Sequence, residues 1–176
     1  MDTALFPSLL GGEFAALDAQ VRSVHGGASR QLSGTATIER GPSMLARLMC
    51  HVAMLPRNQV RERVAVRIET LSDGERWTRY FGNSAPMRSK LYAQGNLLVE
   101  RLGPVTMSFE LVAREGGIDW LLRGVVILGC PLPLRWFRVA SRSGVNGTRY
   151  QFVVLADLAG VGRIIRYEGD LDCESV

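Results

Sequence analysis

Alternation of apolar and polar residues is the feature that most constrains the fold of this chain. From Arg61 to Asp172 it recurs in short segments, among them Val64-Ala-Val-Arg-Ile-Glu69 and Val105-Thr-Met-Ser-Phe-Glu-Leu111. Successive side chains of a β-strand point to opposite faces, so the pattern is typical of strands with one buried and one wetter face. Glycine-containing turns, one of them predicted at Ser143-Gly-Val-Asn-Gly147, separate the segments at intervals of about ten residues. This spacing favours an antiparallel meander over βαβ units.

Two helices are predicted before this region. The first spans residues 12–25, where apolar side chains recur at three- and four-residue steps, and Gly26-Gly27 ends it. A strand is predicted at residues 30–40. The second helix, residues 44–55, is apolar nearly all round, which predicts a buried helix. Because methionine adapts to irregular partners, a lid over a pocket and a membrane-contacting surface remain the alternatives for this helix.

The 176 residues are most simply one domain, residues 1–176. We predict an α+β protein whose curved, mostly antiparallel sheet of about seven to nine strands packs on two helices and forms a partly closed barrel. A strongly twisted sheet must curl or be covered, and either solution tends to leave a cavity.

Composition narrows the classes of partner and location. Lys90 is the only lysine among 21 basic residues, and the arginines are scattered without a basic run, so no nucleic-acid binding is predicted. The arginines indicate either anion recognition or a coding bias toward this residue. Three widely spaced cysteines fit a reducing compartment. With neither a signal-peptide pattern nor an apolar run of transmembrane length, a cytoplasmic location is expected.

Residue types that carry catalysis or bind metals are sparse. The two histidines, His25 and His51, lie on different predicted helices without further ligands at metal-binding spacing, so no metal site is predicted. No glycine-rich nucleotide loop or nucleophile elbow is present, and no cofactor is predicted. His25, at a helix end where the macrodipole favours a cation, is either a general acid or base or a capping or core-edge histidine.

The segment Glu75-Arg-Trp-Thr-Arg79 has the clearest polar signal within a predicted strand. Period two places Trp77 and Arg79 on one face and Arg76 on the other. An arginine on an otherwise apolar face needs a partner, so Arg79 either forms a salt bridge in the interior or contacts an acidic group of a ligand.

Several motifs resemble those of a bacterial family, the domain of unknown function 4166. They are Leu5-Phe-Pro-Ser-Leu-Leu-Gly11, Val24-His-Gly-Gly27, Gly74-Glu-Arg-Trp-Thr-Arg79, Val99-Glu-Arg101-Leu-Gly-Pro104 and Leu128-Gly-Cys-Pro-Leu-Pro133. The resemblance covers nearly the whole chain. Family members often follow NAD(P)-dependent, saccharopine-dehydrogenase-like or short-chain-dehydrogenase-like modules, which makes a dehydrogenase a candidate partner. The family offers no catalytic residues to transfer. Its motifs indicate a candidate ligand-binding set: His25, Arg76, Trp77, Arg79, Glu100 and Arg101.

The leading functional hypothesis is a binding module for an apolar or amphipathic small molecule, lipid-like or polyketide-like, with an arginine at the mouth. One alternative is a cofactor-free isomerase, cyclase or dehydratase in which an interior carboxylate or His25 transfers protons. It requires a buried titratable group with a raised acid pKa at the cavity floor. The other is a docking domain for an NAD(P)-dependent dehydrogenase, which predicts an exposed apolar patch in place of a cavity.

Overall fold

The computed structural model describes residues 4–52 and 55–173. Its strands form one antiparallel sheet in the order β6-β5-β4-β3-β2-β1-β11-β10-β9-β7-β8, and β6 also pairs with β7. Ten of the strands therefore form a closed barrel, and β8 is a short addition on β7. The strands are β1 (Arg30–Arg40), β2 (Gln59–Leu71), β3 (Gly74–Phe81), β4 (Met87–Gln94), β5 (Leu97–Leu102), β6 (Val105–Arg114), β7 (Gly117–Ile127), β8 (Cys130–Pro131), β9 (Phe137–Asn146), β10 (Arg149–Leu158) and β11 (Gly162–Cys173).

The predicted class is confirmed in outline, but the barrel has more strands than seven to nine and is fully closed. Closure follows from β6, which pairs with both β5 and β7 and so leaves no free edge between them. The strand predicted at residues 30–40 is β1. The turn predicted at Ser143–Gly147 is wrong, because β9 runs on to Asn146 and the chain turns at Gly147 and Thr148.

The first predicted helix, residues 12–25, is also wrong in extent. The chain instead forms α1 (Leu5–Leu10), a 3-10 helix η1 (Gly11–Ala16) and α2 (Ala19–His25). Leu17 is extended, with ψ 154°, and the backbone N–H of Asp18 donates to the carbonyl of Gly116 at 2.8 Å. A tertiary hydrogen bond thus replaces the intrahelical one and divides a helix that the apolar periodicity alone would continue. The prediction that a helix ends at His25 is confirmed.

The second helix is α3 (Met44–Val52), and the prediction that it is buried on all sides is wrong. Ala46 and Cys50 are buried, whereas Met44, Leu45 and Leu48 are exposed. Residues 53–54 of the predicted span lie outside the described residues. No helix in the described part of the chain has the length and hydropathy of a membrane span.

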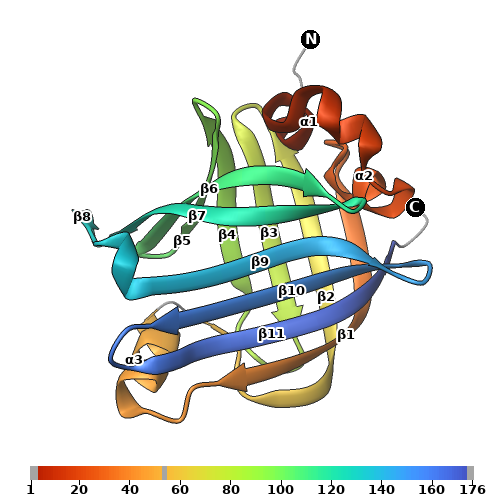
Figure 1. Ribbon diagram of the computed structural model, residues 1–176. Helices are drawn as coiled ribbons and strands as arrows, with labels where there is room; N and C mark the ends of the chain where they lie inside the picture. The colour runs from red at the N-terminus through yellow and green to blue at the C-terminus, as the bar shows by residue number, and fades with distance from the viewer. Residues whose placement is uncertain (1–3, 53–54, 174–176) are drawn as a thin grey trace.

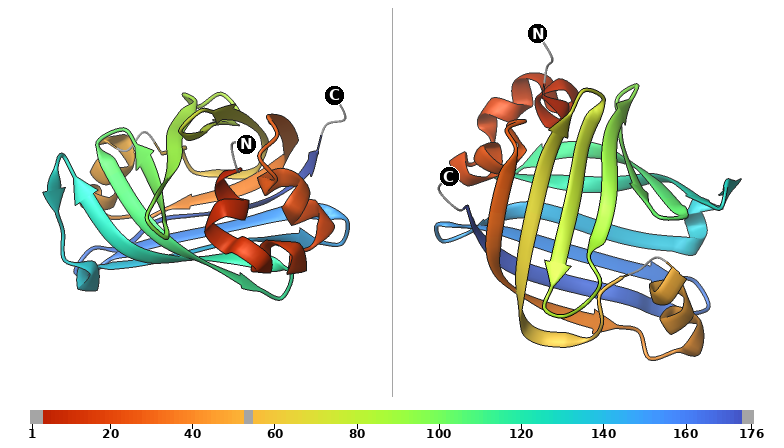
Figure 2. Two further views of the ribbon diagram at one scale, coloured as in Figure 1. Left: turned by 90° about the horizontal axis from the view of Figure 1, so that it is seen from above. Right: turned by 180° about the vertical axis from the view of Figure 1, so that it is seen from behind.

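The helices occupy opposite ends of the barrel (Figures 1 and 2). At one end α1 contacts β4 and β6, while α2 contacts β9 and β10. At the other end α3 lies against β11 and β1. Strands β2–β5 form one wall and β9–β11 the facing wall, and the two sets of strands cross in Figure 1. The interior therefore has sheet on its sides and helices near both of its ends.

The seam between β1 and β11 is a place of close backbone approach. A Cβ atom added to Gly34 would lie 2.0 Å from the carbonyl oxygen of Asp170, and one added to Gly169 would lie 2.4 Å from that of Thr35. Real Cβ atoms do not approach backbone oxygens so closely. A side chain at either position would therefore force the two strands apart locally. Glycine at these positions lets the two strands pair along their whole length.

We expect Gly34→Ala to lower the free energy of unfolding by about 2–3 kcal/mol, because the new methyl group must displace backbone of β11. Thr35→Ala, at the next and exposed position of the same strand, is the matched control and should cost less than about 0.5 kcal/mol. Urea denaturation of both variants checks the expectation. Equal costs at the two positions would contradict a tight seam.

Candidate functional site

The barrel encloses a cavity of about 330 Å³. Side chains from both walls line it, and most of them are apolar, such as Phe81, Met107 and Val154. Leu48 and Met49 of α3 line the cavity at the end of the barrel that bears α3. Because Leu48 is also exposed to solvent, we place the opening of the cavity beside α3.

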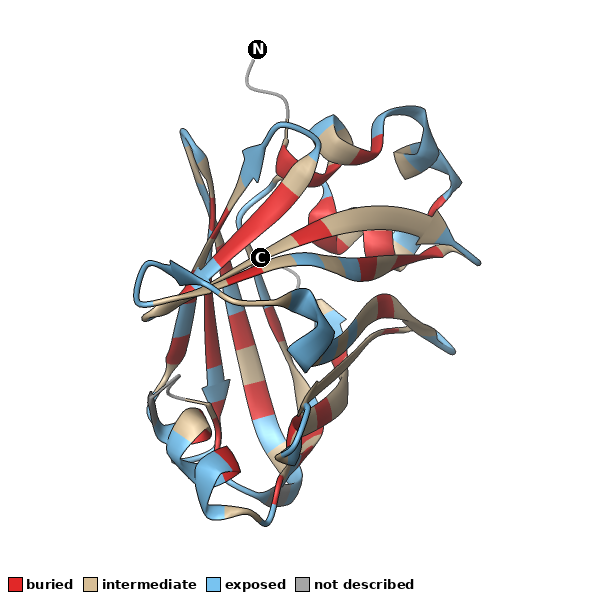
Figure 3. Cartoon of the chain, turned by 60° about the vertical axis from the view of Figure 1, so that its left-hand side comes forward, coloured by how far each residue is buried: buried red, intermediate tan, exposed pale blue. Residues whose placement is uncertain are grey.

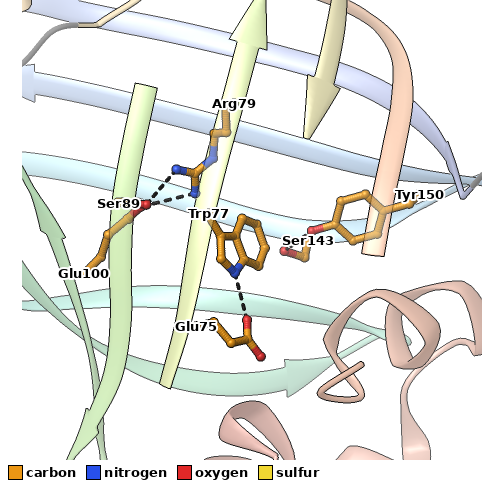
Figure 4. A network of polar contacts seen from close by, with 7 residues as sticks. All are labelled: Glu75, Trp77, Arg79, Ser89, Glu100, Ser143 and Tyr150. Carbon is orange, nitrogen blue, oxygen red and sulfur yellow. Dashed lines mark hydrogen bonds and ion pairs between the residues drawn. The ribbon is translucent and has the colours of Figure 1, made fainter. Parts of the chain in front are cut away.

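A buried ion pair interrupts the apolar lining (Figure 4). The guanidinium of Arg79 donates from Nη1 to Ser89 Oγ at 2.9 Å and from Nη2 to Glu100 Oε1 at 3.2 Å. Both charged side chains are only 11% exposed. The Cζ atom of Arg79 lies 5.0 Å from the centroid of the Trp77 ring, a cation–π distance. The predicted interior salt bridge of Arg79 is thereby confirmed.

The strand period decides which of the six candidate residues meet. Trp77, Arg79 and Glu100 point inward and line the cavity together. Arg76 and Arg101 occupy the alternate positions of β3 and β5 and are exposed on the outside of the barrel. The structure therefore joins three of the set into one cluster and places the two other arginines on the opposite face of the sheet.

His25 is fully buried at the end of α2, behind the cavity lining. Its ring centroid lies 4.1 Å from that of Phe6 and 5.6 Å from that of Trp77. Burial lowers the pKa of His25 to about 3, because the apolar surroundings disfavour the cation. Desolvation of the ring thus outweighs the preference of the helix end for a cation. His25 is a neutral core residue.

A chain of hydrogen bonds joins His25 to two hydroxyl groups. The Tyr150 hydroxyl lies 2.9 Å from Ser143 Oγ and 3.1 Å from His25 Nε2. His25 Nδ1 has no hydrogen-bond partner among the described residues. Tyr150 and Ser143 also line the cavity, and burial raises the pKa of Tyr150 to about 12.

Sequence reasoning missed Tyr150 and Ser143 as site residues. The alternation in Tyr150-Gln-Phe152 marks the inward face of β10, and that face is where Tyr150 lies. For Ser143, the sequence predicts a turn. Its inward position depends on the pairing of β9 with β10, in which Ser143 is opposite Phe152.

Glu75 is a buried carboxyl group with a raised pKa. It accepts a hydrogen bond from Trp77 Nε1 at 2.7 Å, and burial raises its pKa. Its side chain is not among those that line the cavity. The raised-pKa acid that the catalytic alternative requires at the cavity floor is therefore not supplied by Glu75.

No group of three or more potential metal ligands is found among the described residues. Cys50 and His51 are adjacent in α3 but point apart. The Cys50 thiol is buried and donates to the carbonyl of Ile164 at 3.3 Å, while His51 is exposed. This agrees with the divergence of neighbouring side chains on a helix.

A comparison with protein families tests the family resemblance that the sequence motifs indicate. A family model described as Domain of unknown function (DUF4166) matches residues 17–171. The chain belongs to this family. The matched range takes in α2, every strand of the DUF4166 barrel and the cluster of Trp77, Arg79 and Glu100. Searches of curated proteins and of solved structures found no match.

The buried imidazole makes stability depend on pH. Because the pKa of His25 is about 3 in the folded protein and about 6.5 in an unfolded chain, only the unfolded state binds a proton between these values. The free energy of unfolding should then fall as pH drops below about 6.5, by about 2 kcal/mol at pH 5 from this residue.

We expect His25→Gln to lose that part of the slope between pH 6.5 and 5, whatever its stability at neutral pH. His51→Gln, an exposed control, should retain the wild-type slope. Urea denaturation at each pH measures both. Parallel curves for His25→Gln and the wild type would show that the imidazole is already protonated in the folded state.

Removing one charge of the interior pair should be costly. Glu100→Gln leaves the Arg79 cation buried without its counter-ion, and we expect a loss of about 3 kcal/mol in the free energy of unfolding. Glu110→Gln breaks the exposed pair with Arg123 and should cost less than about 1 kcal/mol. If both variants unfold at the same urea concentration, the interior pair is solvated and contributes no more than a surface pair.

Proposed function

We propose that this DUF4166 protein binds an apolar or amphipathic small molecule, lipid-like or polyketide-like, inside the barrel. The observation that carries the proposal is the cavity of about 330 Å³ with its mostly apolar lining. Its size falls within the usual range of small-molecule sites, and such sites combine apolar walls with a few placed polar groups.

The polar groups in the lining favour a ligand with a polar end. Arg79, Ser143 and Tyr150 line the same cavity from β3, β9 and β10. Glu100 already compensates the charge of Arg79, so a hydroxyl or carbonyl group needs no further charge to be accommodated there. A ligand with one hydrogen-bonding head near Arg79 and an apolar body fits a lining that is mostly apolar and has a few polar residues.

The catalytic alternative has less support. A neutral imidazole with a pKa of about 3 is a weak base near neutral pH, and His25 lies behind the lining. Glu75, with its raised pKa, is not a lining residue either. Cofactor-free catalysis and docking on an NAD(P)-dependent dehydrogenase remain predictions. The experiment below bears on both, because each makes a different demand on the cavity.

We expect the purified protein to bind a fluorescent polyene fatty acid with energy transfer from Trp77 and Trp120, both of which line the cavity. Ala156→Phe directs a phenyl ring into the cavity and should weaken binding at least tenfold. Leu155→Phe, the neighbouring position on the opposite face of β10, adds a phenyl group outside and is the control. Fluorescence titration measures both, and native mass spectrometry with organic extraction identifies any co-purified ligand.

Equal binding by Ala156→Phe and Leu155→Phe would place the ligand outside the barrel. Absence of binding together with a ligand-free mass would overturn the proposal and favour the docking alternative. Chemical conversion of an extracted ligand by the protein would instead establish the catalytic alternative.

A further inference from the structure

Exposed apolar side chains gather at the end of the barrel that bears α3. Among the described residues, nine large apolar side chains are exposed, and six of them belong to α3, to the hairpin between β7 and β8, and to η2 (Leu134–Trp136). Figures 1 and 2 show these three elements at the same end, opposite α1 and α2. We call this set the apolar rim: Met44, Leu45, Leu48, Leu128, Leu134 and Trp136.

Helix α3 exposes three of its large apolar side chains to solvent. Its buried face consists of the small residues Ala46 and Cys50, which pack toward β11. Met44 is 87% exposed, and Leu45 and Leu48 are exposed as well. Figure 3 shows much of this helix in the colour of exposed residues. A helix that serves only to cover the barrel would have the opposite arrangement.

Leu128 gives a second, independent indication that this end of the barrel contacts a partner. It is the first residue of the two-residue turn between β7 and β8, with φ 51°, followed by Gly129 with φ 83°. Asn, Asp or Gly fills this position at a lower free energy, because a leucine strains in the left-handed conformation. The leucine is nevertheless 79% exposed, so neither the turn nor the core accounts for it.

Arginine is the commonest charged residue in the segments that form the rim, and the neighbouring Asp157 forms an ion pair with Arg163. The rim residues belong to two segments, 40–61 and 120–156, which contain four and five arginines and no aspartate or glutamate. Arg47 and Arg135 are exposed between rim residues, and neither forms an ion pair with a carboxylate in the described part of the chain. Apolar side chains interspersed with unpaired cations match the acyl–headgroup boundary of an anionic bilayer.

We propose that the apolar rim docks on an anionic lipid bilayer. The cavity opens at this rim, because Leu48 is both an exposed rim residue and part of the cavity lining. This inference rests on the function proposed above. Docking would allow an amphipathic ligand to pass between the bilayer and the cavity without crossing water. The polar head would then lead toward Arg79 while the apolar body follows from the membrane.

The test is co-sedimentation of the full chain with vesicles of phosphatidylcholine alone and of phosphatidylcholine with phosphatidylglycerol. We expect binding to the anionic vesicles that weakens at high salt, because screening reduces the attraction. Leu45→Ser should lower the partition coefficient about tenfold, and Arg47→Gln about fivefold. Tyr80→Ser and Arg76→Gln, exposed on the outer face of β3, are the matched controls and should bind like the wild type.

Three results would overturn the docking surface. They are no binding to anionic vesicles, equal losses for rim and control variants, and a dimer in sedimentation velocity that Leu45→Ser dissociates, which would make a second copy the occupant. The fatty-acid titration without vesicles keeps the two proposals separate, because Leu45 and Arg47 do not line the cavity. Vesicle binding without fatty-acid binding supports the docking surface and refutes the proposed ligand site.

Discussion

Closure of the hydrogen-bonded sheet is the constraint on which the rest of this structure depends. Once β6 pairs with β7 and β1 with β11, every strand of the ten-stranded barrel has two neighbours and no backbone edge is left open. A ten-stranded barrel is too wide for its own side chains to fill, and space remains between the walls. The cavity is thus a consequence of the number of strands that closed the sheet.

That space explains the polar groups of the interior. Charged and hydroxyl side chains that point inward cannot reach water, so they must satisfy one another. Arg79 is satisfied by Glu100 and Ser89, and Tyr150 by Ser143 and His25. The same groups give a mostly apolar cavity some hydrogen-bonding capacity.

The two ends of the barrel differ for a related reason. At the α1–α2 end, Phe6, His25 and Trp120 pack as one aromatic cluster and close the interior. At the α3 end, Leu48 and Met49 line the cavity, and Leu48 is also exposed to solvent. This difference between the two ends is the reason that our proposal places ligand exchange at the α3 end.

The sequence by itself determined the strands, the split of β3 into an inner face with Trp77 and Arg79 and an outer face with Arg76, and the family. Period two is a local property, and it can be read without knowing which strands pair. Only the tertiary structure decided the closure, the partner of Arg79, the burial of His25 and the exposure of α3. Glu100 is 21 residues from Arg79 along the chain, and Tyr150 is 125 residues from His25, so strand register alone brings them together. The periodicity of residues 12–25 likewise could not reveal that a hydrogen bond from Asp18 to Gly116 divides the helix.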